Sequence, residues 1–325
     1  MAHVTVAEEV VVVIATANRA DSLRRTLESL SALDTSQVRW RLIVVNNASE
    51  DDTASVLAEY EARHHLPLVA LYEPRRGKSR ALNRALELIE QGLVIFVDDD
   101  VALSEHWLQA YVRGAARWPD VGMFGGRIVP VFPADAPAWM QSERYVHQAA
   151  IFGAYEPFDH EGITDAWPHG ANAGIRRELI GNSRFDPRFG PGGDYSAMGD
   201  ETEFVSRLIE EKGAEIVYLP EACAHHTVRE EELSRAAIWA RAFKWGRTRG
   251  LVEEGDKQKL RLRGVPINIW LSAARAFLRF APYCFGPEDG YLKYGWQWQV
   301  RSGRVAGYRE LRRRRRGEPN DDGAR

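Results

Sequence analysis

The sequence predicts an α/β fold, with a central, mostly parallel sheet flanked by helices and a helical extension towards the C-terminus. In the first hundred residues, short aliphatic runs alternate with segments of helical periodicity. The aliphatic runs are apolar throughout, as expected for strands buried on both faces of a parallel sheet. Beyond residue 230 this alternation stops and the chain becomes basic and rich in aromatic residues, which predicts the extension.

Each element follows from its local pattern. Strands are expected at 10–15, 42–45, 68–71 and 93–97, and helices at 22–33, 52–64 and 79–89. Such consecutive units imply right-handed crossovers and helices on both faces of the sheet. From Trp118 to Pro168 short strands and Gly/Pro-rich turns are expected. Then come helices at 173–180 and 201–212, and a strand at 215–219.

Composition restricts the class of protein. The chain has 325 residues and only two cysteines, Cys223 and Cys284, which provide neither a disulfide framework nor a zinc site. The N-terminal segment does not resemble a signal peptide, and no apolar run is long enough to span a membrane. These features predict a cytoplasmic protein.

The net charge of -3 conceals an asymmetry. Between Arg235 and Arg316 there are 20 Lys and Arg against 6 Asp and Glu, a local charge of +14, so the remainder carries -17. Five of the ten tryptophans lie in the same stretch. The sequence therefore predicts an acidic body joined to a basic, aromatic region.

Three consecutive aspartates follow the predicted strand at 93–97. Asp98, Asp99 and Asp100 would lie at its carboxyl end, where open α/β sheets bind ligands. Adjacent carboxylates need a cation, and oxygen ligands favour Mg²⁺ or Mn²⁺, most usefully one that bridges a substrate diphosphate. The alternative is a solvated acidic loop, which explains poorly why the three acids directly follow five apolar residues.

Polar residues also follow the other predicted strands. Thr16, Asn18 and Arg19 end the first strand and Asn46 ends the second, where short amides and hydroxyls can bind a base or ribose and arginine a phosphate. Helix capping and turn formation would explain each of these residues equally well. After the third strand, a glycine followed by Lys78 opens a helix among four cations, which suits a diphosphate.

Three further segments carry polar groups. The loop from His169 to Gly174 consists of small residues. Asp200 and Glu201 open a helix whose dipole would keep a carboxylate ionised and able to deprotonate a hydroxyl, although acidic residues are common at that position. His225 and His226 follow the strand at 215–219, where an imidazole could complete a metal site.

Taken in order, six segments resemble family-2 glycosyltransferases with the GT-A fold. They are TANR, VVNNASEDDT, GKSRALNRAL, VDDD, GANAGIRREL and GDETEFVSRL, and the resemblance runs from about Val10 to His226. It implies transfer of a sugar from a nucleoside-diphosphate donor with inversion at the anomeric carbon, and Mn²⁺ or Mg²⁺ as cofactor.

The resemblance also implies roles for individual residues. Side chains near the nucleoside, diphosphate or sugar would be Thr16, Asn18, Arg19, Asn46, Lys78, Asn83, Asp98 and Asp99. The metal ligands would be Asp100, the most direct one, with Asp98 and His225. Gly170, Ala171 and Asn172 would border the acceptor. Many members have Asp where this chain has Asn46. The family's Glu-Asp pair appears here in inverted order as Asp200-Glu201, and both residues are candidates for the catalytic base.

We therefore expect a GT-A catalytic domain over 1–230, divided into a nucleotide-sugar-binding half, 1–118, and an acceptor-binding half, 119–230. A basic, aromatic helical region, 231–316, and a disordered tail, 317–325, would follow. The irregular segment from 125 to 165 is expected to contribute to acceptor choice.

The C-terminal region contains a helical pattern over 265–281. One side carries the apolar residues Ile267, Trp270, Leu271, Ala274, Phe277 and Leu278, and the opposing stripe carries Asn268, Ser272, Arg275 and Arg279. With the run Arg312–Arg316, this suits peripheral contact with an anionic membrane, on the inner face of the cell membrane. The alternative is that the helices pack on the catalytic body. No nucleic-acid recognition motif is present, so no nucleic-acid partner is expected.

The functional prediction is a metal-dependent inverting glycosyltransferase that acts in the synthesis of cell-surface polysaccharide, glycolipid or glycoconjugate. Its partners would be a UDP-, GDP- or dTDP-sugar donor and a hydroxyl acceptor, including a lipid-linked saccharide. One alternative is a sugar-nucleotide nucleotidyltransferase, but such enzymes usually carry a G-x-G-T-R-like loop where this chain has Ala15-Thr16-Ala17-Asn18-Arg19. The other is a non-catalytic nucleotide-sugar-binding protein.

Overall fold

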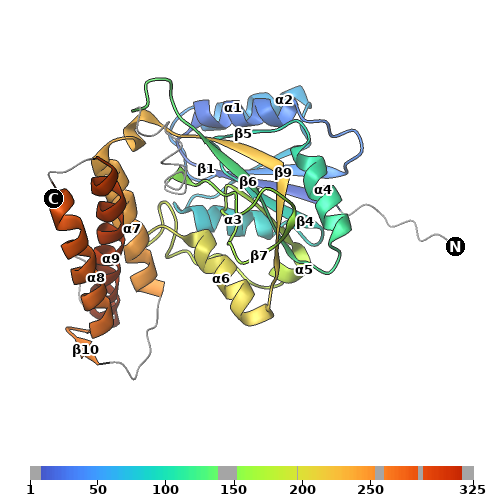
Figure 1. Ribbon diagram of the computed structural model, residues 1–325. Helices are drawn as coiled ribbons and strands as arrows, with labels where there is room; N and C mark the ends of the chain where they lie inside the picture. The colour runs from blue at the N-terminus through green and yellow to red at the C-terminus, as the bar shows by residue number, and fades with distance from the viewer. Residues whose placement is uncertain (1–8, 138–151, 196, 253–259, 285–287, 317–325) are drawn as a thin grey trace. The chain divides into compact units, whose positions relative to one another are not determined.

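The computed structural model describes residues 9–137, 152–195, 197–252, 260–284 and 288–316, which fall into two compact units (Figure 1). The α/β unit contains the described residues up to Ala134 and those within 152–195 and 200–228. The helical unit contains those from Arg229 to Arg316, with the short stretches 135–137 and 197–199. The predicted tail at 317–325 and part of the expected acceptor segment lie outside the described residues.

The α/β unit contains a nine-stranded sheet (Figure 1). Its first half is parallel in the order β3-β2-β1-β4, which are Leu68–Tyr72, Trp40–Asn46, Val10–Thr16 and Leu93–Val97. The connecting helices are α1 (Ala20–Ser31), α2 (Thr53–Arg63) and α3 (Lys78–Leu86). The polar residues that follow these strands therefore share one edge of the sheet.

The second half of the sheet is mixed. β8 (Asn172–Arg176) is antiparallel to β4 and is followed by β6 (Met123–Val131), β9 (Ile216–Thr227) and β5 (Val101–Leu103), while β7 (Gly162–Thr164) pairs with β9. The helices here are α4 (Trp107–Arg117), α5 (Arg177–Ile180) and α6 (Asp200–Lys212).

Hydrophobic cores cover both faces of the sheet. Along β1, Val10, Val12 and Ile14 belong to the core under α1, α2 and α4, whereas Val11 and Val13 belong to the core under α3, α5 and α6. Because successive side chains of a strand point to opposite faces, a strand between two helical layers must be apolar at every position. This explains the continuous aliphatic runs of the sequence.

The prediction of a helix at 173–180 was wrong. Asn172–Arg176 forms the strand β8, and only the short helix α5 follows it. Its first three residues, Asn172, Ala173 and Gly174, are small, and the strand pairs with both β4 and β6; a Cβ on Gly174 would come within 2.8 Å of the Tyr111 ring. The predicted strand at 215–219 is longer than expected, because pairing with β5 continues β9 to Thr227.

The helical unit consists of three main helices, α7 (Arg235–Val252), α8 (Ile267–Phe280) and α9 (Glu288–Arg315). Short 3₁₀ turns, η3 (Glu230–Glu232) and η4 (Ala281–Tyr283), and a small hairpin of β10 (Arg261–Leu262) and β11 (Val265–Pro266) complete it. Among the described residues, no helix is both long and apolar enough to cross a membrane.

Candidate active site

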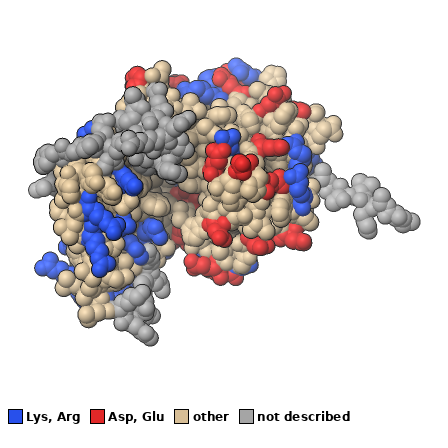
Figure 2. Space-filling model, viewed as in Figure 1, with Lys and Arg blue, Asp and Glu red and all other residues tan. Residues whose placement is uncertain are grey.

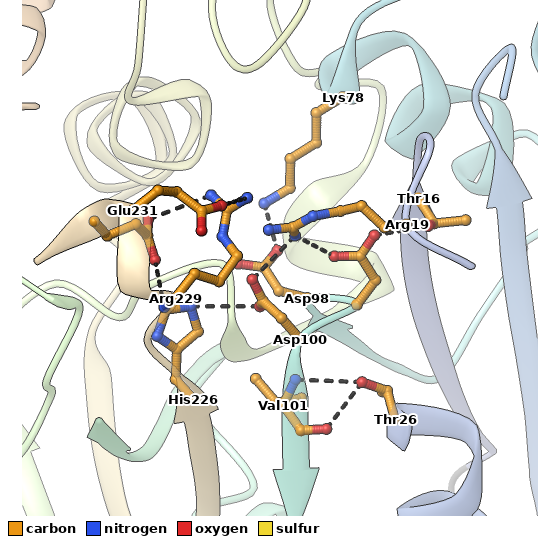
Figure 3. Close-up of polar contacts among 12 residues, drawn as sticks. Thr16, Arg19, Thr26, Lys78, Asp98, Asp100, Val101, His226, Arg229 and Glu231 are labelled. Atoms are coloured by element: carbon orange, nitrogen blue, oxygen red, sulfur yellow. Dashed lines mark hydrogen bonds and ion pairs between the residues drawn. The ribbon is translucent and has the colours of Figure 1, made fainter. Parts of the chain in front are cut away.

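The middle aspartate after β4 is held by the protein itself. Asp99 accepts a hydrogen bond from Thr16 Oγ1 at 2.6 Å and one from Arg19 Nη1 at 2.5 Å, and its side chain is only 4% exposed. Thr16 is the last residue of β1 and Arg19 follows it (Figure 3). Because β1 pairs with β4, the hydrogen bonds to Asp99 join the ends of the two strands. Asp99 therefore has a positioning role, and Arg19 is held where it also reaches Asp100 Oδ2 at 3.0 Å.

Asp98 faces a lysine that also contacts α6. Lys78, the first residue of α3, places its Nζ 2.6 Å from Asp98 Oδ1 and 2.5 Å from Glu201 Oε1 (Figure 3). Burial opposes the charge of Lys78, but the carboxylates of Asp98 and Glu201 hold its pKa above the usual value. The chain thus brings together one predicted donor carboxylate, one predicted base and the cation at the start of α3.

Asp100 lies beside His226, not beside the predicted ligand His225. The Nε2 atom of His226 is 3.4 Å from Asp100 Oδ1 (Figure 3). Adjacent residues of a strand point to opposite faces, and β9 pairs His226 with Val101, the residue next to Asp100. Burial opposes ionisation of Asp100, but His226, Arg19 and Lys78 lower the pKa of its carboxyl below the usual value.

The two acidic residues that open α6 have different surroundings. Asp200 is 1% exposed and lies against Gly190, where a Cβ would come within 2.7 Å of its carboxyl carbon. Burial and the neighbouring Glu201 raise the pKa of Asp200 well above its usual value, which favours the protonated form of this carboxyl. Burial also disfavours ionisation of Glu201, but Lys78 outweighs it and lowers the pKa of Glu201, which stays ionised.

The loop before β8 lies against Glu201. A Cβ on Gly170 would come within 2.2 Å of Glu201 Cγ, so only glycine allows this approach. His169, beside it, is a residue that the sequence analysis did not select. Burial lowers the pKa of His169, while the charges of Glu201 and Asp98 act in the opposite direction, so the neutral form of the imidazole is favoured. The sequence feature that could have identified His169 is its position next to a glycine in a loop of small residues.

The predicted nucleoside contacts Asn18 and Asn46 both form hydrogen bonds with the loop that follows β2. Asn18 has a φ of 55°. Its side-chain Oδ1 accepts a hydrogen bond from the backbone amide of Glu50 at 2.7 Å, and its backbone amide donates one to Ser49 Oγ at 3.0 Å. Asn46 accepts from the Ser49 amide at 3.0 Å and is 6% exposed. These bonds fix the two loops, so both the turn-forming and the nucleoside-binding interpretations remain open for Asn18 and Asn46.

Two predicted contact residues are used by the fold. Asn83 donates to the Phe185 carbonyl and accepts from the Phe185 amide, both at 2.8 Å, so it does not face a ligand as expected. Asn172 is fully buried, and its amide bonds the carbonyls of Arg127 and Ala222 at 2.8 and 2.7 Å. Its Oδ1 atom accepts from Trp107 Nε1 and the Tyr111 hydroxyl at 2.8 and 2.9 Å.

Ala171, the remaining residue predicted to border the acceptor, is partly buried and packs against the core. Of the small-residue loop, the structure therefore brings only Gly170 and His169 next to Glu201.

The residues at the end of β4 fit a divalent cation. Asp100 Oδ1 is buried and makes no hydrogen bond, and it faces an imidazole, which together offer the oxygen and nitrogen donors that Mn²⁺ accepts. Asp98 is a second carboxylate on the same turn, with 27% of its side chain exposed. Within the described part of the chain, no group of three or more His, Cys, Asp or Glu side chains forms a complete metal site. Any ion would therefore need further ligands from its substrate.

Comparison with known proteins is consistent with this geometry. A family model described as "Glycosyl transferase family 2" matches residues 11–183. The succinoglycan biosynthesis protein ExoM of Rhizobium meliloti is 27% identical over 236 residues, which cover 71% of each chain. The glucosyl-dolichyl phosphate glucuronosyltransferase of Haloferax volcanii is 24% identical over 223 residues, 68% of this chain and 69% of the relative.

Two solved structures share the fold. The mannosyltransferase PcManGT from Pyrobaculum calidifontis, in complex with GDP-Man and Mn²⁺, matches with a TM-score of 0.54 and 18% identity over 93% of this chain and 75% of that chain. S. aureus TarS 1-349 matches with a TM-score of 0.52 and 16% identity, covering 95% and 92% respectively. At these identities the likeness concerns the fold alone, and it confirms the predicted fold class.

Proposed function

Because this chain belongs to glycosyl transferase family 2, and is therefore a glycosyltransferase with the GT-A fold, we propose that it is a metal-dependent, inverting enzyme. It would move a sugar from a nucleoside-diphosphate sugar to an acceptor hydroxyl. The observation that carries this proposal is the convergence of Asp98, Asp100 and Glu201 around one lysine and one arginine at the carboxyl end of β4.

The donor diphosphate would bind where the cations and the aspartates meet. Arg19 and Lys78 are both within 3.0 Å of these carboxylates, so they can turn to phosphate oxygens when the donor enters. Asp100 and Asp98 would hold a Mn²⁺ or Mg²⁺ ion, with His226 in the place of the predicted His225. When bound, this ion supplies charge neutralisation to the leaving diphosphate.

Glu201 is the proposed base. It is ionised, it contacts the same lysine as Asp98, and the loop at Gly170 packs directly against it. The acceptor oxygen would attack the anomeric carbon as its proton passes to the Glu201 carboxylate, while the bond to the nucleoside diphosphate breaks on the opposite side. This single displacement inverts the anomeric centre and requires no covalent enzyme intermediate. Asp200, which is buried and has a raised pKa, would support the position of Glu201.

The acceptor belongs, in this proposal, to cell-surface polysaccharide, glycolipid or glycoconjugate synthesis. The names of the two relatives support it, since one refers to succinoglycan biosynthesis and the other to glucosyl-dolichyl phosphate. A lipid-linked saccharide acceptor would bring the enzyme to a membrane, and the basic C-terminal region suits peripheral contact with anionic lipid.

Incubation with a panel of UDP-, GDP- and dTDP-sugars, with and without Mn²⁺, tests the proposal. We expect slow, Mn²⁺-dependent release of free nucleoside diphosphate from one donor class, and its loss in Asp100→Ala. The exposed Asp159, whose side chain is 98% accessible, provides the control Asp159→Ala, which should behave as wild type. Native turnover by Asp100→Ala, or hydrolysis independent of any divalent ion, would contradict the metal role.

A further inference from the structure

The helix α8 carries apolar side chains on two sides, and only one of them packs inside the helical unit. Ile269, Ala276 and Phe280 are at most 5% exposed and face the other helices of the unit. The arc on the other side, which the sequence identified as the apolar one, stays open: Leu271, Phe277 and Leu278 are 49, 45 and 70% exposed.

The hairpin β10–β11 extends this exposed arc. Leu260 and Leu262 are 77 and 55% exposed. The indole of Trp270, which belongs to the arc, donates a hydrogen bond to the Leu262 carbonyl at 3.1 Å, so the hairpin lies directly beside the arc. We call the exposed arc of α8 together with Leu260 and Leu262 the apolar strip.

Arginines flank the apolar strip. At 100° per residue, Arg275 and Arg279 fall next to Leu271 on the helix, and α8 contains no acidic residue. From Arg261 to Arg316 there are 13 Lys and Arg against 3 Asp and Glu. In the face shown in Figure 2, blue side chains gather over the helices of this unit, whereas red ones are spread over the α/β unit.

A cavity of about 280 Å³ opens at the hairpin. Four arginines line it together with Tyr308: Arg261, Arg312, Arg315 and Arg316. Arg312 reaches it across Gly264, where a Cβ would come within 2.3 Å of its Cδ atom, so glycine is required there. Guanidinium groups around a small cavity suit a phosphate oxygen cluster.

We propose that the helical unit docks on an anionic phospholipid surface through the apolar strip, with the lipid phosphates taken by the flanking arginines and by the arginine-lined cavity. An interfacial helix of this kind buries its apolar side at the boundary between headgroups and acyl chains, and basic residues beside it bind the lipid charge. The proposal rests on the membrane contact of the proposed function. It is independent of the transfer chemistry, because none of these residues belongs to the candidate active site.

Co-sedimentation with vesicles tests it on the full chain. Wild type should bind vesicles that contain both phosphatidylcholine and phosphatidylglycerol. It should bind much more weakly to vesicles of phosphatidylcholine alone. Leu271→Glu with Leu278→Glu should lower the vesicle partition coefficient by about tenfold or more, because two leucines no longer enter the apolar layer. The control is Leu88→Glu at an exposed leucine of the α/β unit, 41% accessible, which should bind as wild type.

Charge and insertion are separated by a second set. Arg275→Gln, Arg279→Gln and Arg312→Gln should each lower binding by about fivefold, which corresponds to the usual contribution of one basic residue at an anionic surface. The control is Arg113→Gln on α4, half exposed and paired with Glu221, which should have no effect. Equal binding of the leucine double variant and wild type would overturn the proposal. The proposal would also be overturned if wild type were a dimer in solution that does not bind vesicles and the double variant were a monomer. The apolar strip would then be a self-association surface.

Transfer to a water-soluble acceptor and the thermal unfolding midpoint should be unchanged in every one of these variants. Leu271, Leu278, Arg275 and Arg279 have exposed side chains and Arg312 a partly buried one, and none of them belongs to the candidate active site. Loss of vesicle binding with retained transfer therefore supports the docking surface whatever the donor, and an inactive wild type that still binds vesicles would affect the proposed function alone.

Discussion

Asp200 and Glu201 are adjacent in the chain, yet the fold shifts the pKa values of their carboxyls in opposite directions. Asp200 lies against Gly190 without solvent and carries a raised pKa, whereas Glu201 contacts a buried lysine that lowers its own. A general base must be ionised before it accepts a proton, so the pair has one competent member.

Glu201→Gln should therefore lower kcat by about 10²–10⁴-fold, the usual contribution of a positioned base, with donor binding retained. Asp200→Asn keeps the shape of a side chain whose raised pKa favours its uncharged form, so it should retain activity within about tenfold of wild type. Steady-state kinetics with a fixed donor measures both. A greater loss in Asp200→Asn than in Glu201→Gln would assign the base to Asp200.

Lys78→Met should shift the acidic limb of the pH–rate profile upwards. The pKa of Glu201 lies below its usual value because of Lys78, and activity falls as pH drops through that pKa. Without the cation the burial of Glu201 is no longer offset, its pKa rises, and activity is lost at a higher pH than in wild type. The profile of kcat against pH checks the direction, and Arg84→Met, at an exposed ion pair with Glu87, should leave it unchanged.

At the scale of elements, α3 fixes the loop that leads towards α6. Ser79 Oγ donates to the Phe189 carbonyl at 3.0 Å, the Lys78 amide to the Pro191 carbonyl at 3.0 Å, and Asn83 pairs with both backbone groups of Phe185. The helix that supplies the lysine thus also positions the chain before the proposed base.

Asn83→Ala should destabilise the protein by about 1–3 kcal/mol, because the amide and carbonyl of Phe185 lose partners in a partly buried place. Denaturant unfolding measures the change. The neighbouring exposed position gives the control Arg84→Ala, expected within about 0.5 kcal/mol of wild type. If Asn83→Ala unfolds as wild type but loses donor affinity, the original expectation of a donor contact is restored.

In the helical unit, α7 and α9 pack backbone to backbone at four glycines. A Cβ on Gly246 would lie 1.8 Å from the Val300 carbonyl oxygen, and one on Gly303 would lie 2.1 Å from that of Phe243. Gly250 and Gly307, one turn further on, have equally close neighbours at 2.2 and 2.1 Å. The sequence shows these residues as G-x-x-x-G in both helices.

Gly246→Ala and Gly303→Ala should each lower the thermal unfolding midpoint, because separating the helices costs about 1–3 kcal/mol, more than alanine returns in helix propensity. Gly162→Ala, where the nearest atom would be 3.8 Å away, serves as the control and should be neutral. An unchanged midpoint in both helix variants would show that α7 and α9 separate without cost.

At the scale of the whole molecule, an element could be predicted from the sequence where its hydrophobic pattern is distinctive. Strands buried on both faces are apolar at every position, so the four parallel strands were identifiable. The run at Asn172–Arg176 consists mainly of small residues that suit either state, and only the pairing with β4 and β6 decides for a strand. On α8 the apolar arc was identifiable, but its exposure depends on a second apolar side made of Ile269, Ala276 and Phe280.

The candidate site shows the same division. The aspartates, Lys78 and Glu201 were predicted because motifs mark them. His226, and not His225, lies beside Asp100 because of the register between β5 and β9. That register is set by long-range pairing, which a local motif does not reveal. Asn83 and Asn172 were predicted as ligand contacts because buried amides and ligand-binding amides look alike in a sequence, and only their partners distinguish them.

Removal of divalent ions should stop transfer without unfolding the protein. The described residues contain no complete cluster of three or more metal-binding side chains, so in the proposed function the ion would bind together with the donor and would not support the fold. With excess EDTA we expect activity to disappear and to return on addition of Mn²⁺, while the unfolding midpoint of the donor-free protein stays the same. A drop in that midpoint on chelation would indicate a structural ion.

The amide of Asn172 has an evolutionary consequence. It closes the gap between β6 and β9 where their register shifts between Gly126 and Ile128, and it accepts from both Trp107 and Tyr111. Replacement of Asn172 leaves the Trp107 indole N–H and the two carbonyls without this partner, and loss of either aromatic donor removes one of the two hydrogen bonds to Oδ1. Homologous chains should therefore keep Asn, Trp and Tyr as a set or exchange all three together, and single replacements should be rare in an alignment of related sequences.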